Sequence, residues 1–306
     1  MKDRQEKEDR QNKRPVIFGE VLFDTFPDGS SVLGGAPFNV AWHLKGFGLD
    51  PLFLSRVGDD ENGRKVRHQM HDWGMDLSGL QTDPQHSTGT VNIELNNGQP
   101  RFSILPDRAY DFIAQDECIE LLNKQPGALL YFGTLISRSD VSSSTLSAIR
   151  QMGMPSYVDI NLRDPWWDEE IVKQSIQHSR WIKLNDDEIR LVSEQTDLAK
   201  AAQALIHDYS LNWIIVTKGG EGAFIATKDQ IINCEPARVE KMVDTVGAGD
   251  AFSSVTLYGI LQRWPLQTIL QRAVDFAAQI CMVRGATIRD KVFYQNTLES
   301  WLKESI

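Results

Sequence analysis

Cysteine and long apolar runs are both scarce in this 306-residue sequence. The three cysteines, Cys118, Cys234 and Cys281, are too few and too scattered for a disulfide framework or a zinc site, so we expect buried thiols in a reducing compartment. No run approaches the roughly 18 apolar residues of a membrane-spanning helix, and no signal-peptide segment is recognisable. These absences predict a cytoplasmic protein with no membrane partner.

The sequence also lacks an excess of positive charge. It has 32 Lys and Arg residues against 42 Asp and Glu residues, which gives a formal net charge of −10. This balance argues against nucleic acid or an anionic membrane as a partner, and a phosphorylated ligand would need a local positive site. The six histidines offer one close pair, His68 and His71, which without a third ligand indicates a solvated helix face rather than a metal site.

The first 14 residues differ from the rest, because ten of them are charged. Residues 1–14 are therefore expected to be a disordered tail or a leftover added segment rather than a functional basic arm.

In residues 15–306 short apolar runs alternate with amphipathic stretches. This predicts one α/β domain with a doubly wound, mostly parallel sheet flanked by helices. Strands are expected at 16–18, 51–57, 128–132, 157–160, 181–184 and 213–217, and helices at 39–46, 63–73, 141–152, 169–178, 186–193, 198–209, 265–283 and 297–304.

One region interrupts this alternation. Residues 90–95 alternate apolar and polar side chains, Asn97-Gly98 offers a type I′ turn, and residues 102–105 resume the strand. A hairpin has no place inside a doubly wound sheet, so we expect a small β-lid over a site, with lid strands near 22–33 and 89–105. An edge hairpin without a function is the alternative, and the neighbouring glycine pair at 34–35 favours the lid.

The most informative segment is Asp244-Thr245-Val246-Gly247-Ala248-Gly249-Asp250, which follows an extended, β-branched segment and precedes a helix predicted at 251–261. Two glycines and an alanine keep side chains off the turn. A bound anion could then reach the backbone N–H groups and the positive end of the helix dipole. An aspartate beside that anion is electrostatically unfavourable unless it has a chemical role. The pattern predicts phosphoryl transfer with Asp250 as the base.

A second glycine pair begins the first predicted helix. Gly34 and Gly35 let a ligand approach the backbone closely, and Asn39 can exchange hydrogen bonds with hydroxyl groups. Asp24 ends the first strand region, 19–24, and is expected at the carboxyl edge of the sheet, where open α/β sheets bind ligands. A carboxylate and an amide in one pocket suit a sugar. An ordinary helix entry would explain the glycines alone, but not their combination with the Asp250 turn.

Polar residues at alternate positions close another predicted strand, at Asp159, Asn161 and Arg163. Alternate residues of a strand share a face, so these three can line one wall of a pocket, with Arg163 holding a phosphate oxygen or a sugar hydroxyl. The alternative is a salt-bridged strand end.

Two further strand ends offer contacts to a nucleotide. Asn185 and Glu188, three residues apart at a helix start, predict either a capping box or a site for hydrated Mg²⁺, which prefers oxygen ligands. The glycine-rich run at 217–222 lacks the features of a Walker A loop or a dinucleotide fingerprint. It could cover phosphates or ribose, and a plain hairpin turn into 223–227 is equally consistent.

The two glycine motifs, at 34–39 and 244–250, resemble the two signatures of the pfkB-type sugar kinases, the ribokinase-like family. The resemblance covers nearly the whole chain from about residue 15 and includes 57–63, 159–163, 185–188 and 217–222 in the expected order. It implies a doubly wound α/β domain with a small β-lid that transfers the ATP γ-phosphoryl group to a sugar hydroxyl.

The resemblance also implies roles for individual residues. Asp250 is the general base, and the N–H groups of Gly247, Ala248 and Gly249 form the anion hole. The sugar is held by Asp24, Gly35 and Asn39, Mg²⁺ lies near Asn185 and Glu188, and ATP contacts Thr217, Gly219 and Gly222. Many members also bind a monovalent cation such as K⁺ near the positions matching Asp244 and Thr245.

The sugar itself is indicated by two details. Ala36 stands where ribokinases carry a lysine, and Ala-Tyr-Asp-Phe-Ile at 109–113 resembles the Ala-Trp-Asp-Phe-Ile stretch of fructokinases. We therefore expect D-fructose as substrate and fructose 6-phosphate as product. The alternatives are a kinase for ribose, 2-keto-3-deoxygluconate or another sugar, and a non-catalytic sugar-binding regulator. The edge of the lid hairpin also favours a homodimer through the lid.

Overall fold

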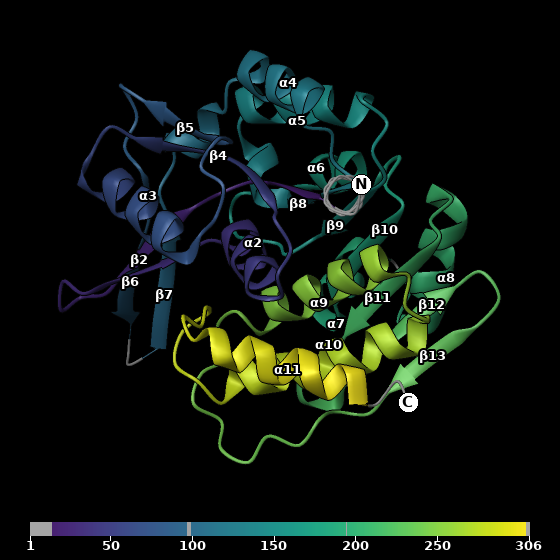
Figure 1. The fold of residues 1–306 in the computed structure, drawn as a ribbon. Coiled ribbons are helices and arrows are strands. Elements are labelled where there is room, and N and C mark those ends of the chain that lie inside the picture. The colour runs from purple at the N-terminus through teal and green to yellow at the C-terminus, as the bar shows by residue number, and fades with distance from the viewer. Residues whose placement is uncertain (1–13, 97–98, 194, 304–306) are drawn as a thin grey trace, which may run out of the picture.

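A nine-stranded sheet forms the centre of the molecule, whose computed structural model describes residues 14–96, 99–193 and 195–303 (Figure 1). Seven neighbouring strands are mutually parallel, and the two strands at one edge are joined through antiparallel pairings, which confirms the predicted mostly parallel sheet. In spatial order the strands are β13 (Ile231–Cys234), β12 (Ala223–Thr227), β11 (Trp213–Thr217), β10 (Trp181–Asn185), β9 (Ser156–Asp159), β8 (Leu129–Gly133), β1 (Pro15–Phe18), β4 (Leu52–Gly58) and β5 (Leu80–Asp83).

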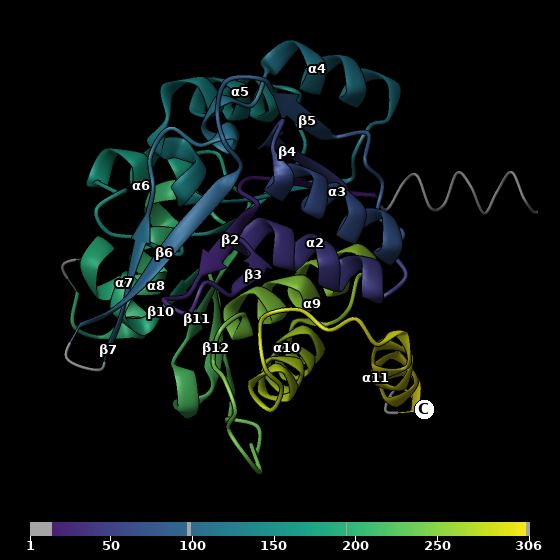
Figure 2. The same cartoon turned by 90° about the vertical axis from the view of Figure 1, so that its left-hand side faces the viewer.

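Helices cover both faces of this sheet, because successive strand residues point to opposite sides. In β1, Ile17 belongs to one buried apolar cluster, whereas Val16 and Phe18 belong to the other. The first cluster packs against α2 (Ala36–Gly46), α3 (Glu61–Trp73), α9 (Ala248–Gln262), α10 (Leu266–Cys281) and α11 (Lys291–Lys303). The second packs against α4 (Gln115–Lys124), α5 (Asp140–Gln151), α6 (Glu169–Ile176), α7 (Asp186–Val192) and α8 (Leu198–Tyr209). Figure 2 shows α9, α10 and α11 together on one side of the molecule.

A second, four-stranded sheet stands beside this body, at the left of Figure 1. Its strands in spatial order are β3 (Ser31–Gly34), β2 (Leu22–Thr25), β6 (Gly89–Asn96) and β7 (Gln99–Ile104). The hairpin expected at 90–105 forms β6 and β7, and β6 pairs in parallel with β2, as predicted for the partner strand. The turn predicted at Asn97-Gly98 lies outside the described residues.

The order of the strands locates the site. The chain enters the sheet at β1, reaches β4 on one side of it, and later reaches β8 on the other side. Open α/β sheets bind ligands beyond the carboxyl ends of the strands where this reversal occurs. Because β2 follows β1 after a short connection, the second sheet leaves the body at the same place.

Several local expectations differ from the structure. The final helix begins at Lys291 rather than at 297, and its predicted last residue, Glu304, lies outside the described part of the chain. Strand β5 and helix α4 were not predicted, because Leu80 is the one apolar residue of β5 and α4 buries two side chains, too few to give a clear pattern. Arg14, the last residue of the expected tail, is held by the fold through Asp50 O at 3.0 Å.

Among the described residues, no helix is long and apolar enough to cross a membrane.

Candidate active site

The first turn of α9 forms one end of the candidate site. Gly247 precedes it with a φ of 80°, and a Cβ at this position would collide with Cα and Cβ of Ala286, so only glycine fits. The helix begins at Ala248 rather than at 251, which places Gly249 and Asp250 on its first turn. Backbone N–H groups there have no intrahelical acceptor, and they lie at the positive end of the helix dipole. The turn is therefore built to hold an anion.

Asp250 is partly buried beside this turn and accepts a hydrogen bond of 2.7 Å from Asn39 Nδ2. Burial raises the pKa of Asp250 to about 6, and the negative charge of Asp159 adds to the rise. The Asn39 hydrogen bond and the positive charges of Lys183 and Arg163 act in the opposite direction, since they stabilise the ionised carboxylate. At neutral pH Asp250 is thus mostly ionised and able to accept a proton.

A buried ion pair supports this turn from the sheet. Lys183 Nζ on β10 donates to both carboxylate oxygens of Asp159 on β9, at 2.8 and 2.7 Å. Asp159 Oδ2 also accepts from Ser253 Oγ of α9 at 2.8 Å, and Lys183 Nζ lies 3.5 Å from where a Cβ of Gly249 would be. Asp159 is 1% exposed. The expected ligand contact of Asp159 is therefore replaced by the alternative, a salt-bridged strand end.

The other end of the candidate site is formed by the second glycine motif and the small sheet. Asn39 is 4% exposed, and its Oδ1 is a buried acceptor without a donor among the described residues. A Cβ on Gly34 would lie 4.0 Å from this oxygen and 3.6 Å from Asp24 Oδ2, so both oxygens face the same space. Gly35 has a φ of 108°, and a Cβ there would come within 2.7 Å of Glu20 O. Two acceptors beside a bare backbone suit a ligand with hydroxyl groups.

Asp24 occupies a different element from the one expected. The first strand of the large sheet ends at Phe18, and Asp24 lies on β2 of the small sheet. It still reaches the site, because β2 follows β1 directly and the small sheet covers the carboxyl edge. Burial raises the pKa of Asp24 to about 6, and the charge of Arg163 opposes this rise.

Glu20 is a site residue that the sequence motifs did not indicate. It is 4% exposed, and its Oε2 has no partner within the described part of the chain. Burial raises its pKa to about 7, with a contribution from the charge of Asp250, while the charges of Arg163 and Arg138 lower it. A glutamate directly after an apolar strand was the available signal, but Glu20 belongs to no motif.

Arg163 reaches the site from a loop rather than from a strand. Strand β9 ends at Asp159, and Asn161 has a φ of 43°, so the predicted shared face of Asp159, Asn161 and Arg163 does not exist. The turn at Asn161 redirects the chain and leaves Arg163 exposed. Its charge nevertheless acts on the carboxylates of Glu20, Asp24 and Asp250. It is thus a cation available to an anionic ligand.

Asn185 and Glu188 form the capping box that was one of their two predicted roles. Asn185 Oδ1 accepts from Glu188 N at 2.7 Å, and Glu188 Oε2 accepts from Asn185 N at 2.8 Å. Glu188 Oε1 accepts from Leu162 N at 2.8 Å. All three oxygens accept from backbone N–H groups, and the other predicted role of this pair, near hydrated Mg²⁺, stays a prediction. In the described ranges no three His, Cys, Asp or Glu side chains gather as a metal-binding group.

The glycine-rich run at 217–222 forms the hairpin turn that was one of its two predicted roles, and its contact with a nucleotide stays a prediction. Thr217 ends β11 beside Asn185, and the turn closes through a bond of 2.8 Å from Lys218 N to Gly222 O. Gly219 lies in a short 3-10 helix, η3 (Gly219–Glu221), with open space around it. The turn lies at the carboxyl edge of the sheet, where a nucleotide could contact it.

Asp244 and Thr245 lie in the loop before α9 and not after a strand, because β13 ends at Cys234. Asp244 Oδ1 accepts from Val246 N at 3.0 Å and Oδ2 from Gly285 N at 3.2 Å, so the carboxylate joins this loop to the segment after α10. Thr245 O accepts a long bond of 3.3 Å from Ala248 N.

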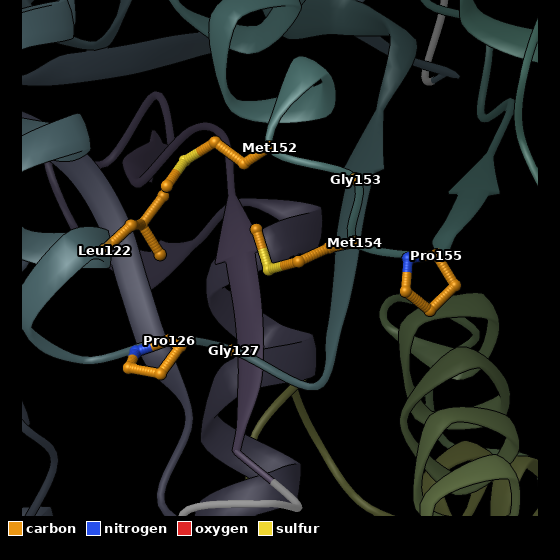
Figure 3. Close-up of a pocket in the computed structure, with 7 residues that line it drawn as sticks. All are labelled: Leu122, Pro126, Gly127, Met152, Gly153, Met154 and Pro155. Carbon is orange, nitrogen blue, oxygen red and sulfur yellow. The ribbon is translucent and has the colours of Figure 1, made fainter.

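Hollows elsewhere on the molecule are separate from this site. One of about 270 Å³ is surrounded by Leu122, Met152 and Met154, with the loops that lead into β8 and β9 (Figure 3). These loops precede parallel strands and therefore lie at the edge of the sheet opposite to the catalytic one. A second, of about 460 Å³, lies among α6, α7 and α8.

Comparison with known proteins agrees with this geometry. The family model described as pfkB family carbohydrate kinase matches residues 11–291. A fructokinase of Klebsiella pneumoniae is 29% identical over 293 residues, which cover 91% of this chain and 94% of that protein. A fructokinase of Escherichia coli is 30% identical over 258 residues, which cover 80% of this chain and 83% of that protein.

Solved structures show the same fold. The fructokinase of Vibrio cholerae O395, in its form with fructose, ADP and calcium ion bound, has a TM-score of 0.79 and 25% identity and covers 94% of this chain and 99% of its own. The fructokinase of Xylella fastidiosa with bound ATP has a TM-score of 0.82 at 18% identity, covering 96% of this chain and 99% of its own. At that identity the second likeness concerns the fold alone.

Proposed function

Because this chain belongs to the pfkB family of carbohydrate kinases, we propose that it transfers the γ-phosphoryl group of ATP to a hydroxyl group of D-fructose, giving fructose 6-phosphate and ADP. One observation carries the assignment of the site. The 2.7 Å hydrogen bond from Asn39 to Asp250 joins the hydroxyl-binding motif of α2 to the anion-binding turn of α9. A hydroxyl and a phosphoryl group would therefore meet at Asp250.

In the proposed reaction Asp250 accepts the proton of the attacking hydroxyl. The hydroxyl oxygen forms a bond to the γ-phosphorus, and the bond from that phosphorus to the ADP oxygen breaks. The N–H groups of Gly247 and Gly249 would stabilise the charge on the transferring group, together with that of Ala248, whose bond to Thr245 O is long at 3.3 Å. Phosphoryl transfer depends mainly on positioning and charge stabilisation, so a carboxylate with a pKa of about 6 is basic enough.

The sugar would lie between the small sheet and α2. Asn39 Oδ1 and the carboxylate of Asp24 would accept hydrogen bonds from its hydroxyls, and the backbone at Gly34 and Gly35 would allow close contact. Arg163 would donate to a hydroxyl or to the phosphoryl group. The small sheet would exclude water that could hydrolyse ATP.

The nucleotide would lie along the carboxyl ends of β10 and β11, against Thr217, Gly219 and Gly222. Magnesium would arrive with the ATP phosphates and keep water ligands, because the oxygens of Asn185 and Glu188 already accept backbone hydrogens. A K⁺ ion would bind at the loop of Asp244 and Thr245. Dependence on ATP, together with free cysteines, fits a cytoplasmic enzyme.

Fructose is proposed rather than another sugar for two reasons. Ala36 and residues 109–113 resemble the fructokinase pattern, with Tyr110 in place of its tryptophan, and the Klebsiella and Escherichia relatives are fructokinases. Ribose, 2-keto-3-deoxygluconate, nucleosides and tagatose 6-phosphate are the competing substrates.

A coupled assay of ADP release with this panel of sugars tests the proposal. We expect the highest kcat/KM with fructose. A higher kcat/KM with another sugar would support the proposed kinase activity but assign a different substrate. Sugar binding without sugar-dependent ADP release would instead show a non-catalytic binding protein.

A further inference from the structure

The chain passes between the body and the small sheet at four places: residues 20–22, 34–35, 89 and 104–105. We call these segments the lid base. Arg138 lies beside them at the end of the 3-10 helix η2 (Thr134–Arg138), which follows β8. Its side chain is 4% exposed, as is that of its partner, Asp111.

The guanidinium of Arg138 makes a dense set of contacts. It binds Asp111 through two parallel bonds of 2.8 Å, from Nε to Oδ1 and from Nη2 to Oδ2. Nη2 also lies 2.8 Å from Tyr110 Oη and 2.8 Å from Leu105 O, at the end of β7. The ring of Tyr110 lies 5.1 Å and that of Trp166 4.6 Å from its central carbon. A planar cation with several donors is needed here, and lysine cannot reproduce it.

The two aromatic rings extend these contacts to other parts of the lid base. Trp166 Nε1 donates to Ile104 O at 3.1 Å, so Trp166 and Arg138 hold consecutive carbonyl groups of the segment that leaves β7. A Cβ on Gly89 would lie 2.6 Å from Tyr110 Cε1, so the ring packs directly against the first residue of β6. Arg138 thereby connects both ends of the β6–β7 hairpin to the body.

Arg138 also faces the segment that leads into β2. Its charge acts on the buried carboxylate of Glu20. Arg138 Nη1 and Glu20 Oε2 are both buried polar atoms without a hydrogen-bond partner among the described residues. The same guanidinium is thus electrostatically coupled to the segment that carries Asp24 toward the site.

We propose that Arg138, paired with Asp111, is a positioning residue that sets the small sheet over the sugar and so determines sugar affinity. The inference rests on the proposed function, in which Asp24 of β2 binds a hydroxyl. The proposal also gives residues 110–111 a role, because both contact the guanidinium of Arg138. Arg138 acts through the lid base and not on the transferring phosphoryl group.

Kinetic constants of Arg138→Lys and of the double variant Arg138→Met with Asp111→Asn test this role. The double variant avoids leaving an unpaired buried carboxylate, which could prevent folding. We expect the sugar KM to rise about tenfold or more, while the KM for ATP stays within about twofold and kcat falls less than the sugar KM rises. An unchanged sugar KM, or equal rises in both KM values, would overturn the proposal.

Arg150→Met is the matched control. Arg150 also binds carbonyl groups, of Gln174 at 2.7 Å and of Gln177, and lies 5.3 Å from the ring centre of Phe132. It joins α5 to α6 in the body and does not contact the lid base. We expect its sugar KM to equal that of the wild type, and a rise as large as that of the Arg138 variants would assign both to general loss of stability.

Amide hydrogen exchange supplies a readout that needs no substrate. In Arg138→Lys we expect exchange at least several-fold faster in β6 and β7, with no change in β8, β9 and β10. Uniformly faster exchange, or unchanged exchange in the small sheet, would refute the positioning role. If no sugar is phosphorylated, the proposed function fails, but this measurement still decides the role of Arg138.

Discussion

The two halves of the candidate site are built in different ways. The half proposed to hold the phosphoryl group, here the phosphoryl half, consists of consecutive residues, Gly247 to Asp250, on one helix turn. The sugar half collects Glu20, Asp24, Asn39 and Arg163 from the connection after β1, from β2, from α2 and from a loop. A short segment can specify the first by itself, whereas the second exists only after the small sheet has docked on the body.

The supports of the two halves differ as well. The turn of α9 is tied to the centre of the large sheet by Ser253, Asp159 and Lys183. The small sheet is tied at its base by Arg138 and its partners. We therefore expect substitutions in the first half to act mainly on kcat and those in the second mainly on sugar affinity. The predictions below test this division.

Asp250→Asn should have the largest effect. The amide cannot accept the hydroxyl proton, so we expect kcat to fall about 10³-fold, within the range for loss of a general base. Sugar affinity, measured by calorimetry, should change by less than about threefold, since the introduced amide oxygen could still accept the hydrogen bond from Asn39. Near-normal turnover would show that Asp250 is not the general base.

Glu20→Gln tests how much the buried charge of Glu20, in the sugar half, lowers the free energy of unfolding. The pKa of Glu20 is about 7 in the folded protein against 4.5 for the free side chain, so ionisation destabilises the fold as pH rises from 4.5 through 7. The variant should be more stable than wild type by about 3 kcal/mol at pH 8.5 and by less than about 1 kcal/mol at pH 5, as measured by urea unfolding.

The control for this measurement is Glu299→Gln, at an exposed position of α11. Its stability should follow that of the wild type at both pH values. A gain for Glu20→Gln that does not depend on pH would show that the buried charge is not its cause.

Gly247→Ala tests the backbone of the phosphoryl half. The left-handed φ and the collision with Ala286 should lower the free energy of unfolding by about 2 kcal/mol and reduce kcat more than the sugar affinity. Gly220→Ala is the control, because a Cβ at Gly220 meets nothing within 4 Å. Equal losses of stability at the two positions, measured by thermal unfolding, would contradict this explanation.

Asn39→Ala should give the smallest effect, and this effect should involve both halves of the site. Loss of the hydrogen bond to Asp250 removes an interaction that lowers its pKa, so the acidic limb of the kcat/KM profile should move to higher pH, by up to about one unit. The sugar KM should rise about tenfold with the loss of Oδ1. A rise in the sugar KM without a shift of the acidic limb of the kcat/KM profile would show that Asn39 acts on sugar binding alone.

The sequence predicts the fold well where the information is local. Alternating apolar runs identify six strands of the large sheet, and the anion-binding turn and the capping box of Asn185 and Glu188 are contained in short segments. The alternation of residues 90–95 even identifies the hairpin of the small sheet.

Features that depend on register or on distant partners could not be predicted. Asp159 is removed from the site because the sheet places Lys183 directly opposite it, and that register is not a local property. The left-handed turn at Asn161 ends a pattern that otherwise resembles a strand. Arg138 acquires its role from Leu105, Asp111 and Trp166, which meet only in the folded chain.

The three carboxyl groups of the site also connect ligand binding to the proton concentration of the solvent. Glu20 has a pKa of about 7, raised in part by the charge of Asp250, and Asp24 and Asp250 each have a pKa of about 6, so all three titrate close to neutral pH. A hydroxyl that donates to one of them stabilises its ionised form and expels a proton. The heat of sugar binding should then vary with the ionisation enthalpy of the buffer, and the proton becomes a competing ligand for the pocket.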